Sequence, residues 1–173
     1  MKKLIVLVAM TVSLASSASM IDWKYSGVAA DTDSSIYLYV GSTAPSANAF
    51  ADVDALKGDA NVINTGVTVG DVYNSRTKTH SYLANGSAEY DWSAGDKYYF
   101  VLVSSDEKNL YIDPTAATVA AGNIYNKGET AGTVLSTTTG ASSHTYAAFA
   151  PEPTSGLLML VGLGALALRR RRA

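Results

Sequence analysis

Hydrophobic and polar residues alternate in short stretches along the middle of the chain, which is the pattern of β-strands. Ile36, Leu38 and Val40 alternate with two tyrosines, so this segment predicts a half-buried strand with an aliphatic face and a tyrosine face. Residues 98–103 are apolar at every position, which predicts a central strand covered on both sides. Residues 110–112 follow a polar turn and predict the next strand.

An Asn85-Gly86 dipeptide separates two further strand-like stretches, residues 81–83 and 88–90. Both central residues of a type I′ turn need a positive φ, and Asn-Gly is favoured there. The pattern therefore predicts a β-hairpin at this dipeptide and a three-stranded meander over residues 79–103.

One helix is predicted over residues 47–57. Phe50, Val53 and Leu56 are spaced so that they share a helix face, and Gly58 provides a stop signal. A helix this short is stable only when its apolar face packs against other elements. Together the segments predict a mainly β fold, a small antiparallel β-sandwich-like domain with one short helix.

The chain begins with the features of a secretory signal peptide. Two lysines precede an apolar stretch, residues 4–15, and small residues follow it. The stretch is too short to span a bilayer stably, and the small residues suit signal peptidase. We expect residues 1–18 to be removed between Ala18 and Ser19, with cleavage after Ala15 as the alternative.

The C-terminal segment has three parts in a fixed order. They are Pro151, Glu152 and Pro153, then the apolar residues 154–168, then Arg169, Arg170, Arg171 and Arg172. Arginines on one side only of an apolar stretch obey the positive-inside rule, which places the C-terminus in the cytoplasm and the body outside. As a helix the stretch would measure about 22 Å, short of the roughly 30 Å hydrocarbon core. A short transmembrane helix suits a transient anchor.

This tripartite tail resembles the PEP-CTERM sorting signal of Gram-negative and related bacteria. Many members of that family carry Val where this chain has Ala150. The resemblance implies recognition by exosortase, a membrane-embedded cysteine protease-transpeptidase that cleaves near the Pro-Glu-Pro, often alongside exopolysaccharide production. It implies an inner-membrane intermediate with a cytoplasmic C-terminus, followed by location at the cell surface or outside the cell. A permanent, uncleaved anchor is the alternative.

Composition limits what the body can do. Six of the thirteen basic residues lie at the two ends, so residues 19–150 carry seven basic against fourteen acidic side chains. A body this acidic offers no basic groove for nucleic acid. The absence of Cys excludes disulfides, thiolate zinc sites and cysteine nucleophiles.

The chain is therefore predicted to have four parts. They are the signal peptide 1–18, a β-rich exported domain 19–114, an Ala/Thr/Ser/Gly-rich region 115–150 that is partly a spacer, and the sorting signal 151–173.

Metal and catalytic signals in the body are sparse. Asp31 and Asp33 lie two positions apart, as the first ligands of a calcium loop do, but the glycine and glutamate of an EF-hand are absent. A calcium ion shared with Asp22 or Asp113 and a solvated turn are the two interpretations of this pair. No other cofactor is expected.

A secreted hydrolase would need His80, Glu89 or Asp91 to converge in a pocket. His80 and His144 are the two histidines of the chain, and no Gly-x-Ser-x-Gly motif accompanies them. A polar strand face explains His80 without catalysis, and His144 falls in the predicted spacer.

We therefore expect a non-enzymatic structural or adhesive component of the envelope or extracellular matrix. A carbohydrate-binding module for exopolysaccharide or host glycans is the alternative, and a secreted hydrolase is a lower one. The rings that would stack on sugars are Trp23, Tyr25, Tyr37, Tyr39, Tyr90, Trp92, Tyr98 and Tyr99.

Overall fold

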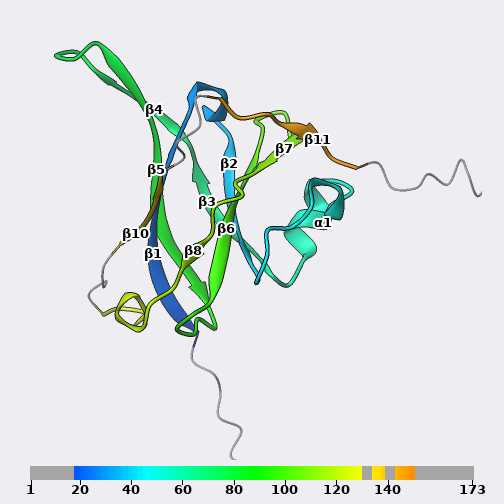
Figure 1. Cartoon of the computed structure of the whole chain (residues 1–173), viewed down its shortest axis with the longest axis vertical. Coiled ribbons are helices and arrows are strands. Elements are labelled where there is room, and N and C mark those ends of the chain that lie inside the picture. The colour runs from blue at the N-terminus through cyan, green and yellow to red at the C-terminus, as the bar shows by residue number, and fades with distance from the viewer. Residues whose placement is uncertain (1–17, 130–133, 139–142, 151–173) are drawn as a thin grey trace, which may run out of the picture.

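The computed structural model of the chain describes residues 18–129, 134–138 and 143–150. Two β-sheets pack face to face, and a short helix lies beside the second sheet (Figure 1). The predicted mainly β fold with antiparallel sheets and one helix is confirmed. Most of the signal peptide and all of residues 151–173 lie outside the described residues.

The first sheet has the strand order β10-β1-β5-β4, with β9 also paired to β1. Its strands are β1 (Ser19–Gly27), β4 (Gly70–Asn74), β5 (Thr79–Tyr90), β9 (Tyr125–Asn126) and β10 (Leu135–Thr138). β1 and β5 are antiparallel along nine paired positions, whereas β10 runs parallel to β1. The long β1–β5 pair forms the centre of this sheet.

The second sheet has the order β11-β7-β6-β2-β3, with β8 also paired to β6. Its strands are β2 (Ser35–Val40), β3 (Val62–Thr68), β6 (Lys97–Val103), β7 (Asn109–Ile112), β8 (Ala117–Thr118) and β11 (Ala147–Ala148). β6 lies between β2 and β7 and is antiparallel to both.

The main core lies between the two sheets. Ile36 and Leu38 point into it from β2, where they meet the aromatic side chains of β1. Phe100 of β6 packs against Trp23 and Tyr25, with ring centroids 5.6 and 5.0 Å away. The predicted aliphatic face of residues 36–40 therefore faces the partner sheet.

A second apolar cluster covers the outer face of the second sheet. Tyr37 and Val101 point to this side, where they join Leu56 of α1 (Val53–Gly58). β6 thus has both faces buried, as its uninterrupted apolar sequence predicts, because a helix covers the face that the first sheet does not.

The predicted helix over residues 47–57 forms as two separate pieces. A 3₁₀ turn, η2 (Ala47–Ala49), precedes α1, and Phe50 between them is extended. The Asp52 side chain accepts a hydrogen bond of 2.7 Å from the Ala55 amide and so starts a new helix. Phe50, Val53 and Leu56 still share one cluster.

The predicted hairpin at Asn85-Gly86 is wrong, because both residues lie inside the continuous strand β5. Gly86 pairs with Trp23 across the sheet. A Cβ at Gly86 would lie 3.0 Å from Cζ2 of Trp23, so this glycine makes room for an indole ring rather than a turn.

The predicted meander over residues 79–103 is also wrong, since β5 and β6 belong to different sheets. The hairpin of this region joins β4 to β5 instead. Asn74 Oδ1 accepts hydrogen bonds from the amides of Arg76 and Thr77, and Lys78 adopts a φ of 56°. The end of this hairpin projects beyond the rest of the molecule (Figure 1).

In residues 134–138 and 143–150 the structure differs from the predicted spacer. β10 pairs with β1 and β11 pairs with β7. Leu135 and Tyr146 pack against the main core, and Phe149 joins the outer cluster. A few large side chains at wide intervals are enough to attach these segments to the body, because each one packs into a core formed mainly by other strands.

Among the described residues, no helix is both long enough and apolar enough to cross a membrane. The predicted membrane stretch, residues 154–168, falls outside that part of the chain.

Candidate functional site

A buried carboxylate lies where the end of β1 meets the start of β2. Asp31 closes the 3₁₀ turn η1 (Ala29–Asp31) and is fully buried. Its Oδ2 accepts a hydrogen bond of 2.9 Å from the Val28 amide, which ties the side chain back to its own turn. The turn therefore aims the carboxylate into the protein rather than into solvent.

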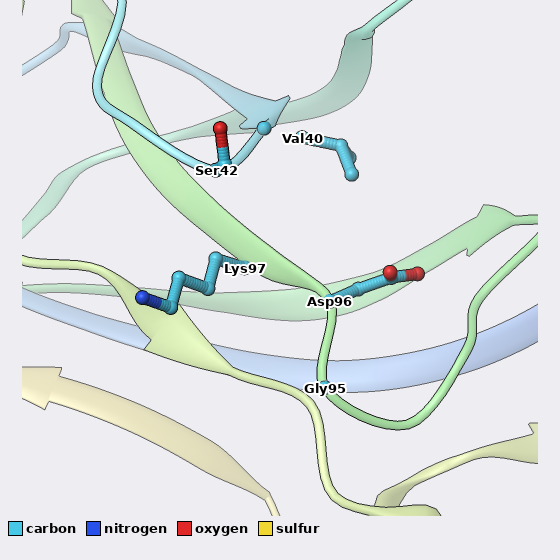
Figure 2. A pocket seen from close by; sticks show the side chains of 6 residues that line it. Val40, Ser42, Gly95, Asp96 and Lys97 are labelled. Carbon is cyan, nitrogen blue, oxygen red and sulfur yellow. The ribbon is translucent and has the colours of Figure 1, made fainter.

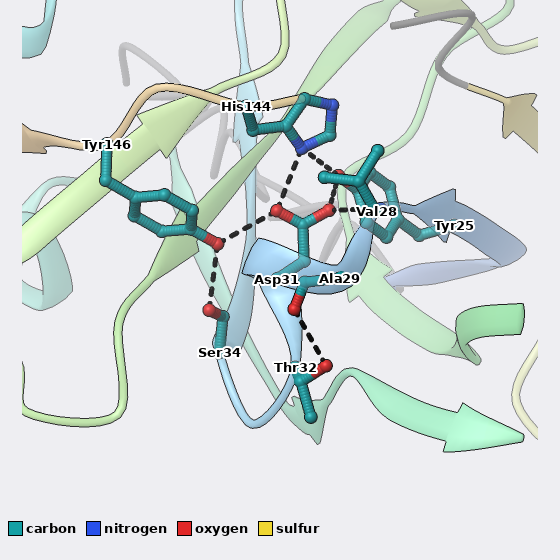
Figure 3. A network of polar contacts seen from close by, with 8 residues as sticks. All are labelled: Tyr25, Val28, Ala29, Asp31, Thr32, Ser34, His144 and Tyr146. Carbon is teal, nitrogen blue, oxygen red and sulfur yellow. Dashed lines mark hydrogen bonds and ion pairs between the residues drawn. The ribbon is translucent and has the colours of Figure 1, made fainter. Parts of the chain in front are cut away.

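His144 reaches this carboxylate from the other end of the chain. Its Nδ1 lies 2.8 Å from Asp31 Oδ1, and both side chains are fully buried (Figure 3). The ring stacks on Tyr111 with centroids 4.0 Å apart and planes at 9°. An ionised carboxylate only accepts hydrogen bonds, so His144 donates through Nδ1.

Two tyrosines complete the network. Tyr25 donates to Asp31 Oδ2 at 3.0 Å, and Tyr146 donates to Asp31 Oδ1 at 3.1 Å. The Tyr146 hydroxyl also lies 2.8 Å from Ser34 Oγ. Asp31 thus collects two tyrosine hydroxyls, one imidazole and one amide, which is the condition under which a buried charge is tolerated.

Electrostatics keep these hydroxyls protonated. Burial, followed by the Asp31 charge, raises the pKa of Tyr25 far above its usual range. Burial also raises the pKa of Tyr146, against the opposing hydrogen bond from Ser34 and with the help of the Asp31 charge. Both groups therefore act as permanent hydrogen-bond donors to the carboxylate at physiological pH.

A second buried carboxylate, Asp113, lies near the network. Its Oδ1 accepts a hydrogen bond of 2.8 Å from the Thr115 amide, and its charge contributes to the raised pKa of Tyr25 and of Tyr111.

The proposed calcium ligands do not act together. The Asp31 oxygens are turned to four protein donors, whereas Asp33 is exposed on the far side of the turn at a φ of 62°. Within the described residues no group of three or more histidine or acidic side chains is arranged to hold a metal.

A His–Asp pair also occurs in hydrolases, where the second ring nitrogen of the histidine contacts a nucleophile. The His144 side chain has no exposed surface, and its Nε2 has no hydrogen-bond partner among the described residues. The nearby hydroxyl of Ser34 is directed to Tyr146. What the described residues show is that the network joins β1, η1 and residues 143–150.

The network fixes the segment that immediately precedes the sorting tail. We call residues 143–150 the strap. Besides His144 and Tyr146, it is held by Phe149, whose amide donates to the Lys108 carbonyl at 3.3 Å. Ala150 donates to the Phe50 carbonyl at 3.2 Å. The chain is therefore bonded to the body up to the last residue before Pro151.

The comparisons with known proteins identify the segment on the C-terminal side of the strap. A family model for the PEP-CTERM protein-sorting motif matches residues 150–172. The tail is a PEP-CTERM sorting motif. The motif implies export, sorting to the cell envelope and processing by exosortase at the membrane. No curated protein and no solved structure matches the chain.

The PEP-CTERM match covers the predicted sorting residues. Pro151, Glu152 and Pro153 and the arginines Arg169, Arg170, Arg171 and Arg172 all fall inside the matched range. Their placement lies outside the described residues.

At the other end, the predicted signal-peptidase site coincides with the start of the fold. Ala18 is exposed, and Ser19 is the first residue of β1. Ser19 Oγ accepts a hydrogen bond of 3.0 Å from the Trp92 amide and donates to the Tyr90 carbonyl at 3.2 Å. Cleavage between Ala18 and Ser19 would leave this first strand complete.

The candidate sugar-binding rings are mostly in the interior. Six of the eight are buried, namely Trp23, Tyr25, Tyr37, Trp92, Tyr98 and Tyr99. Tyr39 and Tyr90 are half-buried. A buried ring cannot stack on a sugar, so the six buried rings serve packing.

Two of the candidate hydrolase residues, His80 and Glu89, lie far apart. His80 pairs with Asp71 at 2.8 Å, and Glu89 pairs with Lys127 at 3.1 Å. His80 and Glu89 both lie on β5, nine positions apart and on opposite faces, which separates these two residues by about 30 Å. They therefore do not belong to one catalytic centre.

A pocket at one end of the second sheet is lined by Val40, Ser42, Asp96 and Lys97 together with glycines (Figure 2). Asp96 and Lys97 point in different directions there. The Asp96 carboxylate accepts a hydrogen bond of 2.8 Å from the Ser93 amide and so stabilises its own turn.

Sequence reasoning misses the Asp31–His144 network. The local pattern assigns Asp31 to calcium and His144 to a spacer, because 113 positions separate them. The available signal is indirect: His144, Tyr146 and Phe149 are large side chains in a segment of small ones.

Proposed function

We propose that this chain is a non-enzymatic structural or adhesive domain of the cell envelope or extracellular matrix, delivered by its PEP-CTERM tail. The observation that carries the proposal is the strap. It bonds a folded body directly to the first residue of the sorting motif, so the body itself is the cargo that the tail delivers.

The length of chain between body and membrane supports this interpretation. Four residue steps separate Ala150 from the start of the apolar stretch at residue 154. Even fully extended they cover at most about 14 Å. The body would thus stand close to the membrane while the tail is processed, and exosortase would act beside a folded domain.

The interior of the body also supports a role without catalysis. The His–Asp pair is buried and joins chain segments, and His80 and Glu89 lie far apart on β5. What the body offers to its surroundings is its outer surface and its sheet edges. These are the features that a structural or adhesive protein uses.

The proposal is tested by intact mass and fractionation of the protein from its native cells. Wild type should lose both ends and be found at the surface or in the medium. Replacing Arg169 to Arg172 with Ser should leave the tail attached and the protein in the membrane fraction. Replacing the same four arginines with Lys keeps the positive charge and is the matched control for membrane orientation.

A mature protein that begins near Ser19 but retains Ala173 and stays in the membrane would contradict the proposed delivery. It would indicate a permanently anchored envelope domain. Hydrolysis of polysaccharide or peptide by the purified wild-type protein would contradict the non-enzymatic role.

A further inference from the structure

The hairpin formed by β4 and the start of β5 has an open edge. We call residues 70–83 the arm. β4 is the terminal strand of the first sheet, and all five of its residues are exposed. Among the described residues no strand pairs with its outer side. Unpaired amides and carbonyls on such an edge are a template for another strand.

The side chains of β4 make this edge unusual. Val72 and Tyr73 are each 55% exposed, and they are two of the three large apolar side chains exposed in the described part of the chain. Proteins normally protect an edge with lysine, proline or a bulge. β4 has no lysine or proline, and its one charged residue, Asp71, is held by His80 at 2.8 Å.

The arm is organised before any partner arrives. The His80 ring contacts Tyr73 with centroids 4.9 Å apart, and it stacks on Tyr82 at 6.3 Å with planes at 12°. The contacts of His80 with Tyr73 and Asp71 join the two strands, which lowers the entropy cost of adding a third strand.

Charge indicates which partner fits. Arg76 and Lys78 at the tip of the arm make no ion pair within the described residues, while residues 19–150 as a whole carry twice as many acids as bases. Asp33 is exposed at the base of the arm, where its amide donates to the Val69 carbonyl at 3.0 Å. One end of β4 is therefore basic and the other acidic.

We propose that β4 is a homodimer interface, in which a second copy of this chain adds its own β4 in antiparallel orientation. A two-fold axis at Val72 pairs Val72 with its counterpart and Asp71 with the partner's Tyr73. The same axis brings the basic tip of each arm toward the acidic base of the other. The interface is self-complementary, as a two-fold contact must be, and it does not depend on the proposed envelope role.

The absence of Cys from the chain allows a clean cross-linking test. In the purified full chain, Val72→Cys should form a disulfide-linked dimer under mild oxidation, because residues paired across antiparallel strands have Cα atoms about 4.5–5.5 Å apart. Ser81→Cys is the matched control. Ser81 is exposed and lies beside Val72 on the same face, but its counterpart would be three strand spacings, about 14 Å, away.

The expected result is a dimer yield for Val72→Cys at least about tenfold above that for Ser81→Cys, since a disulfide cannot bridge the longer distance. Protein purified from cells should show a concentration-dependent dimer by sedimentation, and Val72→Lys should abolish it. Replacing Arg76 and Lys78 with Ser should weaken the dimer and remove its salt dependence.

Equal cross-linking of the two cysteine variants would overturn the proposal, as would a wild type that sediments as a monomer at the highest attainable concentration. A monomer whose arm is protected only when polysaccharide is added would assign the edge to that ligand instead.

Discussion

At the scale of single residues, Asp31 is the polar group on which the interior depends most. It is fully buried and holds β1, η1 and the strap together through Tyr25, Val28, His144 and Tyr146. A buried carboxylate with all its hydrogen bonds made adds little net stability. Removing its charge is costly, because several buried donors then lose their acceptor.

Asp31→Asn tests this dependence. The variant should lose about 3–5 kcal/mol of unfolding free energy, because an amide cannot accept from four donors and its own NH₂ opposes them. Asp33→Asn, two positions away and exposed, should change stability by less than about 0.5 kcal/mol. Urea unfolding of both variants makes the comparison, and equal losses would refute the role given to Asp31.

At the scale of elements, β5 and α1 illustrate two ways in which neighbours reshape local preferences. The helix predicted over residues 47–57 forms as two pieces because Asp52 caps a new helix start. Its apolar side chains still pack in the same cluster. The turn signal at Asn85-Gly86 is overridden completely, because β1 pairs with β5 straight through it.

Gly86→Ala tests why β5 carries a glycine there. The added methyl would meet Cζ2 of Trp23 at 3.0 Å, so we expect a loss of about 1–3 kcal/mol from overpacking. Gly122→Ala is the control, since a Cβ at Gly122 meets nothing within 4 Å. If both variants unfold at the same urea concentration, the space needed by the Trp23 indole does not explain the glycine at position 86.

At the scale of the whole molecule, buried tyrosines connect stability to alkaline pH. Burial raises the pKa of Tyr98 above its usual value, and Tyr25 and Tyr146 are raised in the same direction. Below pH of about 10 these tyrosines are neutral in both the folded and unfolded states. Above it they ionise only when unfolded, so the free energy of unfolding falls as pH rises.

We therefore expect the urea midpoint to be steady from about pH 8 to 10 and to decrease beyond it. Tyr98→Phe should lessen the decrease. It should also be neutral or stabilising at pH 8, because the Tyr98 hydroxyl is buried without a hydrogen-bond partner in the described part of the chain. Tyr73→Phe, at an exposed position, should leave the decrease unchanged. An identical slope in all three proteins would exclude Tyr98 as a cause.

Much of the fold was predictable where its signals are local. The uninterrupted apolar run of β6 predicts burial on both faces, which is confirmed. The alternation in β2 predicts a half-buried strand; its aliphatic face does lie in the main core, but its tyrosine face is covered as well, because Tyr37 packs in the outer cluster. The candidate site was not predictable, because Asp31 is recognisable as a buried acceptor only when His144 and Tyr146 are brought to it.

The sequence by itself determined the sorting tail and the faces of the central strands, since each is written in residues adjacent along the chain. Only the tertiary structure decided that β5 runs through Asn85-Gly86, that the strap belongs to the body, and that β4 ends a sheet. The physical reason is that pairing across a sheet and satisfaction of a buried charge depend on partners that distant segments supply, and local spacing carries no information about them.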